Sequence, residues 1–196
     1  MSPTVEPLTG DALASALPAL ARLRIAVFRD WPYLYDGTLA YEEGYLRKFS
    51  SSKDAVIVAA RDQGEIVGVA TGSPLRDHAA EFAKPFEAAG HDIDRIFYFG
   101  ESVLLPSYRG RGIGHRFFDA REAHARALDR FAHTTFCGVV RPPEHPAKPA
   151  GYRPLDAFWE SRGYRRIEGL TAEFTWKDLG AEEPTAKHMQ FWMRAL

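Results

Sequence analysis

The run Ile96-Phe-Tyr-Phe-Gly-Glu-Ser-Val-Leu-Leu105 continues directly into Pro106-Ser-Tyr-Arg-Gly-Arg-Gly-Ile-Gly114. The first run is rich in aromatic and β-branched residues and predicts a buried strand, which Pro106 ends. An amphipathic helix is expected from the last glycine to about Phe131. A strand, loop and helix in this order direct several backbone N–H groups and the positive end of the helix at one point. That point favours an anion such as phosphate.

The loop itself supports phosphate binding. Three glycines at alternating positions between residues 110 and 114 remove side chains where a diphosphate would approach the backbone, and Arg109 and Arg111 add positive charge. A glycine-rich turn that serves folding alone is the alternative. A P-loop would need Lys followed by Ser or Thr where this chain has His115-Arg116. A dinucleotide fingerprint would need G-x-G-x-x-G after the first strand, whereas this loop reads G-x-G-x-G and comes after the middle of the chain.

The rest of the chain alternates helical and extended patterns and predicts one α/β domain over residues 1–196. Asp11 is expected to be the N-cap of a helix that ends at Phe28. The segment Asp62-Gln-Gly64 separates two apolar, β-branched runs and predicts a hairpin. Further helices are expected at 40–49, 77–89 and 155–162, and strands at 55–61, 65–71, 134–140, 164–176 and 187–193.

The helix that follows the glycine loop is expected to pack on the sheet through one apolar face. The residues expected to face the sheet are Ile113, Phe117, Ala120, Ala123, Ala127 and Phe131. Those expected to face solvent are Arg116, Glu122, Arg126 and Asp129.

Composition limits the classes of function. The 196 residues are 45% hydrophobic, which is enough for one core. The 25 Lys and Arg nearly balance the 26 Asp and Glu, which argues against nucleic acid or an anionic membrane as a partner. Without a signal-peptide pattern or a membrane-spanning apolar run, a cytoplasmic protein is expected. The seven His show no metal-binding spacing, so no metal is expected, and Cys137 is expected to be a buried thiol.

Two motifs resemble a known family. The segment Val103-Leu-Leu-Pro-Ser-Tyr-Arg-Gly-Arg-Gly-Ile-Gly114 resembles the acetyl-CoA signature of the GNAT N-acetyltransferase superfamily, R/Q-x-x-G-x-G/A, which is matched by Arg109, Gly112 and Gly114. The segment Ala157-Phe-Trp-Glu-Ser-Arg-Gly-Tyr164 is similar to the family's late helix, which ends in F-Y-x-x-x-G-F. With the order of elements, the likeness extends from about Thr4 to Met193.

The resemblance implies an α/β (α+β) fold with a mixed, mostly antiparallel central sheet flanked by helices. The sheet would splay between the strand ending at Leu105 and the strand ending near Val140, and pantetheine would lie in the splay. Backbone groups of Val103 and Leu105, with Leu104 between them, would contact the pantetheine amides. The pyrophosphate would be wrapped by Arg109, Gly110, Arg111, Gly112, Ile113 and Gly114. Phe158 and Ser161 are implied as further cofactor neighbours.

The resemblance also implies direct attack of an amine on the thioester of acetyl-CoA, which requires removal of a proton from an ammonium. Glu101 is the candidate base, acting through water, and the alternative is a strand-edge carboxylate paired with an arginine. The family's tyrosine that protonates the thiolate is replaced by Trp159, and the family's asparagine seven residues earlier is replaced by Tyr152. Tyr152 or Tyr164 would then donate the proton, unless solvent or the product amine does. Core packing is the favoured role of Tyr164.

In this family the first two helices and their connection shape the acceptor site. Aromatic walls with carboxylates suit a cationic amine; here that region holds Trp31, Tyr33, Tyr35, Asp36, Tyr41, Glu42 and Glu43. Glu42 and Glu43 have an alternative role as surface residues that stabilise a helix start. Arg116 and Arg121 would meet the ribose phosphate or simply be solvated.

We therefore predict an N-acetyltransferase that transfers acetyl from acetyl-CoA to a primary amine of a small molecule or protein. A homodimer is a family-level expectation. The alternatives are a non-catalytic acyl-CoA-binding sensory domain and a nucleotide-phosphate enzyme.

Overall fold

The computed structural model describes residues 3–78 and 80–196. Its described strands form one seven-stranded sheet in the order β1-β2-β3-β4-β5-β7-β6. The strands are β1 (Thr4–Leu8), β2 (Val56–Asp62), β3 (Glu65–Pro74), β4 (Ile96–Leu104), β5 (His133–Val139), β6 (Arg165–Trp176) and β7 (Thr185–Ala195). Every neighbouring pair is antiparallel except β4 and β5, which are parallel. The predicted mixed, mostly antiparallel sheet is confirmed.

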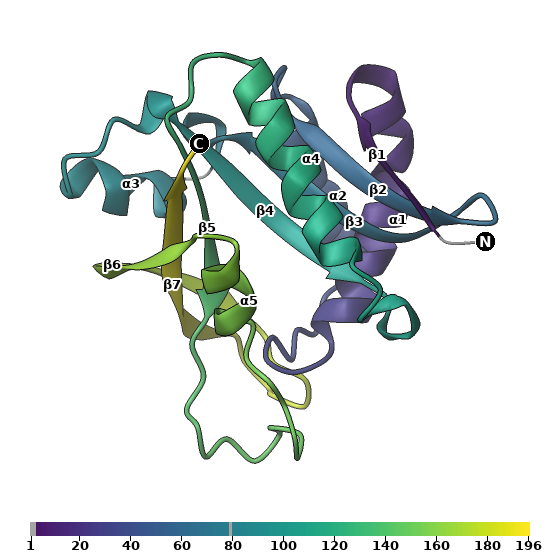
Figure 1. Cartoon of the computed structure of the whole chain (residues 1–196). Helices are drawn as coiled ribbons and strands as arrows, with labels where there is room; N and C mark the ends of the chain where they lie inside the picture. The colour runs from purple at the N-terminus through teal and green to yellow at the C-terminus, as the bar shows by residue number, and fades with distance from the viewer. Residues whose placement is uncertain (1–2, 79) are drawn as a thin grey trace.

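Helices cover both faces of the sheet (Figure 1). They are α1 (Gly10–Phe28), α2 (Leu39–Ser50), α3 (Ala80–Ala88), α4 (Ile113–Ala127) and α5 (Asp156–Ser161). α4 and α5 pack on one face, where Phe117, Phe118 and Phe158 join the apolar side chains of the central strands. α1 and α2 pack on the other face. α3 packs against β6 and β7 through a third cluster that includes Phe86 and Phe191.

The predicted elements are present with small shifts in their ends. The strand β1 was not predicted, because it is a five-residue edge strand in which only Leu8 is buried. Thr9 occupies the N-cap position of α1, so the prediction of Asp11 as N-cap is wrong. The helix α4 ends at Ala127 rather than near Phe131, because the chain turns through a positive φ of 52° at Asp129. The 62–64 hairpin is confirmed, with positive φ at both Gln63 and Gly64.

The buried face of α4 is rotated from the predicted one. Ala123 and Ala127 are exposed, whereas Phe118, Arg121 and Glu122 are buried. Glu122 accepts hydrogen bonds from side chains at the end of α5 and on β7, namely Arg162, Tyr164 and Arg194. The solvent-facing prediction for Glu122 is wrong because these partners compensate the desolvation of its charge, which hydrophobic periodicity does not register.

The parallel strands β4 and β5 separate partway along their length. They pair over Ile96–Tyr98 and His133–Thr135. β4 then continues to Leu104 and β5 to Val139 without further pairing to each other in the described ladder. The predicted splay between these two strands is confirmed.

A β-bulge on β4 lies beside the splay. Ala70 is opposite Ser102 but Gly72 is opposite Phe99, so Thr71 faces two residues of β4, Gly100 and Glu101. Because side chains alternate between the two faces of a strand, one extra residue reverses the faces beyond it. Phe97 and Phe99 therefore pack under α4, whereas Val103 packs with α1 on the opposite face.

Arg121 of α4 closes the α4 side of the bulge. Its guanidinium donates to Thr71 O at 3.1 Å, to Glu101 O at 3.3 Å and to Ser102 Oγ at 3.0 Å. It also lies 4.2 Å from the ring centroid of Phe99. The bulge removes carbonyls from regular ladder pairing, and Arg121 supplies donors to them. Burial lowers the pKa of Arg121 from 12.5 to about 10, so the side chain is still charged at neutral pH.

Replacing Arg121 with Met should lower the free energy of unfolding by about 3 kcal/mol, because the change leaves buried carbonyl groups without donors. Urea denaturation of both proteins measures the loss. The matched control is Arg116→Met on the same helix, where the side chain makes one hydrogen bond, to Pro3 O, and is exposed. A loss for Arg121→Met no larger than that of the control would show that Arg121 does not support the bulge.

Candidate active site

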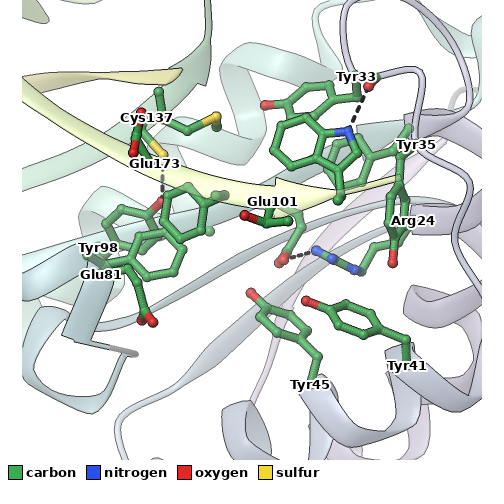
Figure 2. Close-up of a pocket in the computed structure, with 17 residues that line it drawn as sticks. Arg24, Tyr33, Tyr35, Tyr41, Tyr45, Glu81, Tyr98, Glu101, Cys137 and Glu173 are labelled. Carbon is green, nitrogen blue, oxygen red and sulfur yellow. Dashed lines mark hydrogen bonds and ion pairs between the residues drawn. The ribbon is translucent and has the colours of Figure 1, made fainter. Parts of the chain in front are cut away.

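A cavity of about 480 Å³ lies beside the bulge, on the face of the sheet covered by α1, α2 and α3 (Figure 2). β4 contributes Tyr98, Gly100 and Glu101 to it, and Cys137 comes from β5, so the cavity lies where the two strands separate. The other lining residues are Arg24, Phe28, Tyr33, Tyr35, Tyr41, Tyr45, Glu81, Phe82, Glu173, Phe174, Thr175, Trp176 and Met189.

Glu101 is held in this cavity by three partners. Thr71 Oγ1 donates to Glu101 Oε2 at 2.5 Å and accepts from the Glu101 backbone N–H at 2.9 Å. Arg24 Nη1 donates to Glu101 Oε1. Tyr45 lies beside the carboxylate, and its own ring stacks 4.4 Å from the Arg24 guanidinium. The bulge and these contacts fix the carboxylate in one orientation.

Burial alone raises the pKa of the Glu101 carboxyl, but the charge of Arg24 and the hydrogen bonds from Thr71 and Tyr45 outweigh it. The net pKa lies below the ordinary value of 4.5. Glu101 is therefore a carboxylate at neutral pH. The pairing with an arginine that was predicted as the alternative is present, inside the cavity rather than at a sheet edge.

Arg24 joins Glu101 to a second buried carboxylate, that of Glu42. Arg24 Nε donates to Glu42, which also accepts from the Tyr35 hydroxyl at 2.9 Å. The Glu42 side chain is fully buried, whereas Glu43 is exposed, so the surface role considered for both residues applies to Glu43 alone. Arg24 was missed by sequence reasoning. Its position within the apolar stripe of α1, beside Leu20 and Leu23, was the available signal.

The predicted acceptor region divides in the structure. Tyr33, Tyr35 and Tyr41 line the cavity. Asp36 instead forms an ion pair with Lys177 at 2.8 Å, which lowers its pKa. Trp31 packs against His145 and Tyr152 in the proline-rich loop. The helix α3 and the strand β6 supply further cavity residues that the sequence did not indicate, because they meet the first two helices only in the folded chain.

The two tyrosines considered for proton donation, and the Trp159 that replaces the family's tyrosine, have different surroundings. Tyr152 lies outside the cavity lining, with its ring 5.9 Å from that of Trp31, and burial raises its pKa. Tyr164 is fully buried, and its hydroxyl is 2.8 Å from Thr134 Oγ1, which agrees with core packing. Trp159 packs on Phe136, with ring centroids 5.0 Å apart. Neither tyrosine is brought to the cavity.

Cys137 lies on the cavity wall, 3.1 Å from the Tyr98 hydroxyl, and is partly rather than fully buried. Desolvation raises the pKa of its thiol to about 12. It is therefore protonated at neutral pH, and the expectation of a buried thiol holds in part, since the side chain lies at the cavity wall rather than in the core.

The loop after β4 has the backbone geometry expected of an anion site. Gly110 and Gly112 both have φ of 75°, which glycine adopts without strain, and Gly112 is the N-cap residue of α4. Arg116 N donates to Gly112 O, so the N–H groups of the preceding first-turn residues have no acceptor within the helix. The side chains of Arg109 and Arg111 fold back onto Leu104 O and Ser107 O.

The prediction that Val103 and Leu105 offer their backbone to pantetheine is wrong by one residue. Leu105 N donates to Val67 O at 3.0 Å, so it faces β3. Val103 lies opposite Val69 two positions earlier in the same ladder and faces β3 as well. The backbone groups of Leu104 therefore point to the splay. The sequence indicates the strand but not which of its alternate residues pairs with β3.

Phe158 and Ser161 lie on α5 beside this loop. The Phe158 ring contacts that of His115 at 4.9 Å and lies 3.5 Å from the point where a Cβ on Gly114 would be. The Ser161 hydroxyl donates to Phe158 O at 2.7 Å within α5. Arg121, buried at the bulge, meets neither solvent nor a ribose phosphate, so both interpretations of that residue were wrong.

Residues 3–78 and 80–196 contain neither a cluster of metal-ligating side chains nor a helix able to span a membrane. No three His, Cys, Asp or Glu side chains are grouped as they would be around a metal ion. No helix in this part of the chain combines the length and apolar character needed to span a bilayer.

A mixed sheet that splits between two parallel strands, a glycine-rich loop with the backbone geometry of an anion site at the end of one of them and a cavity at the split together match the architecture that the family resemblance implies. The sequence model of the GNAT acetyltransferase family matches residues 20–164, and the chain belongs to that family. Acetyl transfer from acetyl-CoA is the general reaction that this membership supports.

Solved structures share this fold. A ribosomal-protein-alanine N-acetyltransferase from Brucella melitensis is 16% identical, with 98% of this chain and 99% of that chain covered and a TM-score of 0.62. An aminoglycoside acetyltransferase in complex with coenzyme A is 16% identical, with 99% and 95% covered and a TM-score of 0.59. A Salmonella typhimurium protein assigned as an acetyltransferase and solved with its cofactor acetyl-CoA is 13% identical, with 100% and 95% covered and a TM-score of 0.58. A search of curated protein sequences found no match.

Replacing Gly112 with Val should weaken acetyl-CoA binding at least about tenfold, because a branched side chain would stand where the backbone must approach a pyrophosphate. Isothermal titration calorimetry measures the affinity. Gly180→Val is the matched control, since Gly180 has φ of 77° and equally open surroundings but lies in the turn before β7. Equal affinities in the two variants would contradict the assignment of the loop.

Proposed function

We propose that this chain transfers the acetyl group of acetyl-CoA directly to a primary amine of a small molecule or protein while both substrates are bound. The observation that carries the proposal is the position of Glu101. Its ionised carboxylate lies in the cavity where β4 and β5 separate, on the strand that leads into the anion-binding loop. An ammonium and a thioester would thus meet beside one fixed negative charge.

Acetyl-CoA would be held mainly by backbone groups. The pyrophosphate would lie on the first turn of α4 and the glycines of residues 110–114, with Arg109 and Arg111 turning from their present carbonyl partners toward it. Leu104 would pair with a pantetheine amide in the splay. Phe158 would border the cofactor through its place next to Gly114. Ser161 keeps its proposed place near the cofactor, but its hydroxyl already has a partner within α5.

The reaction needs one proton removed before attack. Glu101 would take a proton from the substrate ammonium through a water molecule. Because the pKa of the Glu101 carboxyl lies below the ordinary value, Glu101 would then pass this proton to solvent. The free amine then forms a C–N bond to the acetyl carbonyl carbon as the C–S bond breaks. The nitrogen gives its second proton to the departing thiolate. The products are the amide, coenzyme A as a thiol and one released proton.

The source of the thiolate proton differs from the family's usual tyrosine. Trp159 replaces that residue and packs on Phe136 and Trp192. The indole N–H is a hydrogen-bond donor but not an acid near neutral pH. Tyr152 was the candidate from the sequence, but it packs on Trp31 outside the cavity lining, which gives it no support. We therefore favour the product nitrogen as the proton donor.

Three further predictions belong to this proposal. They are a single acyltransferase domain over residues 1–196, a cytoplasmic location and a homodimer.

The first experiment compares thermal stabilisation by acetyl-CoA, CoA and ATP and then measures thiol release with a panel of amines. Acetyl-CoA at about 100 times its Kd should add about 2.7 kcal/mol to the stability of the folded state. Stabilisation with amine-dependent thiol release is the expected result. Stabilisation without release from any amine would favour the non-catalytic acyl-CoA sensor, and stabilisation by ATP alone would favour a nucleotide-phosphate enzyme.

Replacing Glu101 with Gln should reduce kcat about 10²- to 10³-fold while leaving the KM for acetyl-CoA near its original value, because the base is lost but the cofactor loop is intact. Steady-state kinetics between pH 6 and 9.5 provide the test. Circular dichroism checks that the variant is folded. We expect it to fold because Arg24 keeps Glu42 as a partner after the substitution. Unchanged turnover at neutral and high pH alike would remove Glu101 as the base.

A further inference from the structure

Among the residues that the structure describes, the cavity lining offers a substrate no positive charge that is not already paired. Its lining includes one guanidinium, that of Arg24, and three carboxyl side chains, those of Glu81, Glu101 and Glu173. Arg24 is the cation among them, and it is bonded to Glu101 on one side and to Glu42 on the other. A carboxylate on a bound substrate would therefore be desolvated without a partner, which is strongly unfavourable.

Two carboxylates in the cavity wall are not neutralised in this way. Glu81 on α3 and Glu173 on β6 are both exposed, and Figure 2 shows them on the opposite side of Glu101 from Arg24. Within the described part of the chain Glu81 has no ion-pair partner. Glu173 lies 3.4 Å from an imidazole, that of His188, which carries charge only when protonated. The cavity thus has a negative end in addition to the fixed carboxylate of Glu101.

The walls between these charges are aromatic. Nine of the 17 lining residues are Phe, Tyr or Trp. Phe82 and Phe174, which come next in sequence after Glu81 and Glu173, lie with ring centroids 4.4 Å apart. Faces of Tyr and Trp rings attract ammonium groups and also cover apolar chains. Such walls accommodate an apolar spacer whose ends are cationic.

Given the proposed function, we propose that the amine acceptor is a dication. One ammonium loses its proton and is acetylated beside Glu101. A second ammonium lies near Glu81 and Glu173. An apolar or aromatic spacer joins the two, and the molecule has no carboxylate. Free amino acids are thereby disfavoured as acceptors, and diamines and polyamines are favoured.

The test uses two matched sets of amines. One set is 1,5-diaminopentane, 1-aminopentane and 5-aminopentanoate, and the other is 1,4-bis(aminomethyl)benzene, 4-methylbenzylamine and 4-(aminomethyl)benzoate. Within each set the spacer is constant and the distal group is positive, neutral or negative. Affinity is measured by calorimetry with and without saturating CoA, and kcat/KM is measured by thiol release. The diamine should exceed the monoamine at least about fivefold, and the amino acid should be the poorest ligand.

The variant that tests the negative end is the double substitution Glu81→Gln, Glu173→Gln. It should reduce the diamine-to-monoamine ratio of affinities and of kcat/KM to near one. The matched control is Glu87→Gln, Glu168→Gln, which removes two exposed carboxylates from the same helix and strand outside the cavity. The control should keep the ratio of the unsubstituted protein, since long-range charge alone is screened by salt.

Equal or better binding of the monoamines or amino acids overturns the dication assignment, and so does an equal effect of the two double variants. Absence of binding by all six amines also overturns it. Binding of CoA separates failure of this inference from failure of the proposed function. A protein that binds diamines selectively but does not bind CoA would keep the dication assignment and lose the transferase assignment.

Discussion

Where β3 and β4 pair, Thr71 lies opposite both Gly100 and Glu101, and the site depends on this single mismatch. It turns Glu101 from the face of α4 to the face of the cavity. The distortion is stabilised from both sides of the sheet, because Arg121 donates to the displaced carbonyls and Arg24 pairs with the Glu101 carboxylate. Each arginine is buried at a cost in desolvation, and each is compensated by several partners.

The same arrangement links charge to reaction and to selectivity. Arg24 helps to keep Glu101 ionised, so in the proposed reaction the carboxylate would be available to a substrate ammonium near neutral pH. Arg24 is paired with both Glu42 and Glu101, so its positive charge is already balanced by two carboxylates. In the proposed reaction, the arginine that keeps the base ionised would thus also disfavour a carboxylate on the substrate. The indole of Trp159 packs against Phe136 and Trp192, and in the proposed reaction it donates no proton.

Backbone geometry defines the side of the site where the cofactor is proposed to bind. β4 pairs with β3 on one edge and leaves its other edge free where β5 departs. Leu104 is on that free edge, and the chain then turns through two glycines of positive φ into α4. A family match over residues 20–164 and structures that share the fold at low identity agree with an arrangement carried by backbone rather than by particular side chains.

The sequence by itself indicated the order of most elements and the glycine-rich loop, because these follow from local periodicity and from glycines whose spacing is visible in the chain. The mixed, mostly antiparallel sheet and its splay were implied by the family resemblance that the two motifs carry. The sequence also indicated Glu101, Tyr33, Tyr35 and Tyr41. Only the tertiary structure decided which residues meet them. The partnership of Arg24 with Glu42 and Glu101 joins positions up to 77 residues apart, and the bulge that directs Glu101 depends on pairing between two strands. Such long-range contacts leave no periodic trace in the sequence.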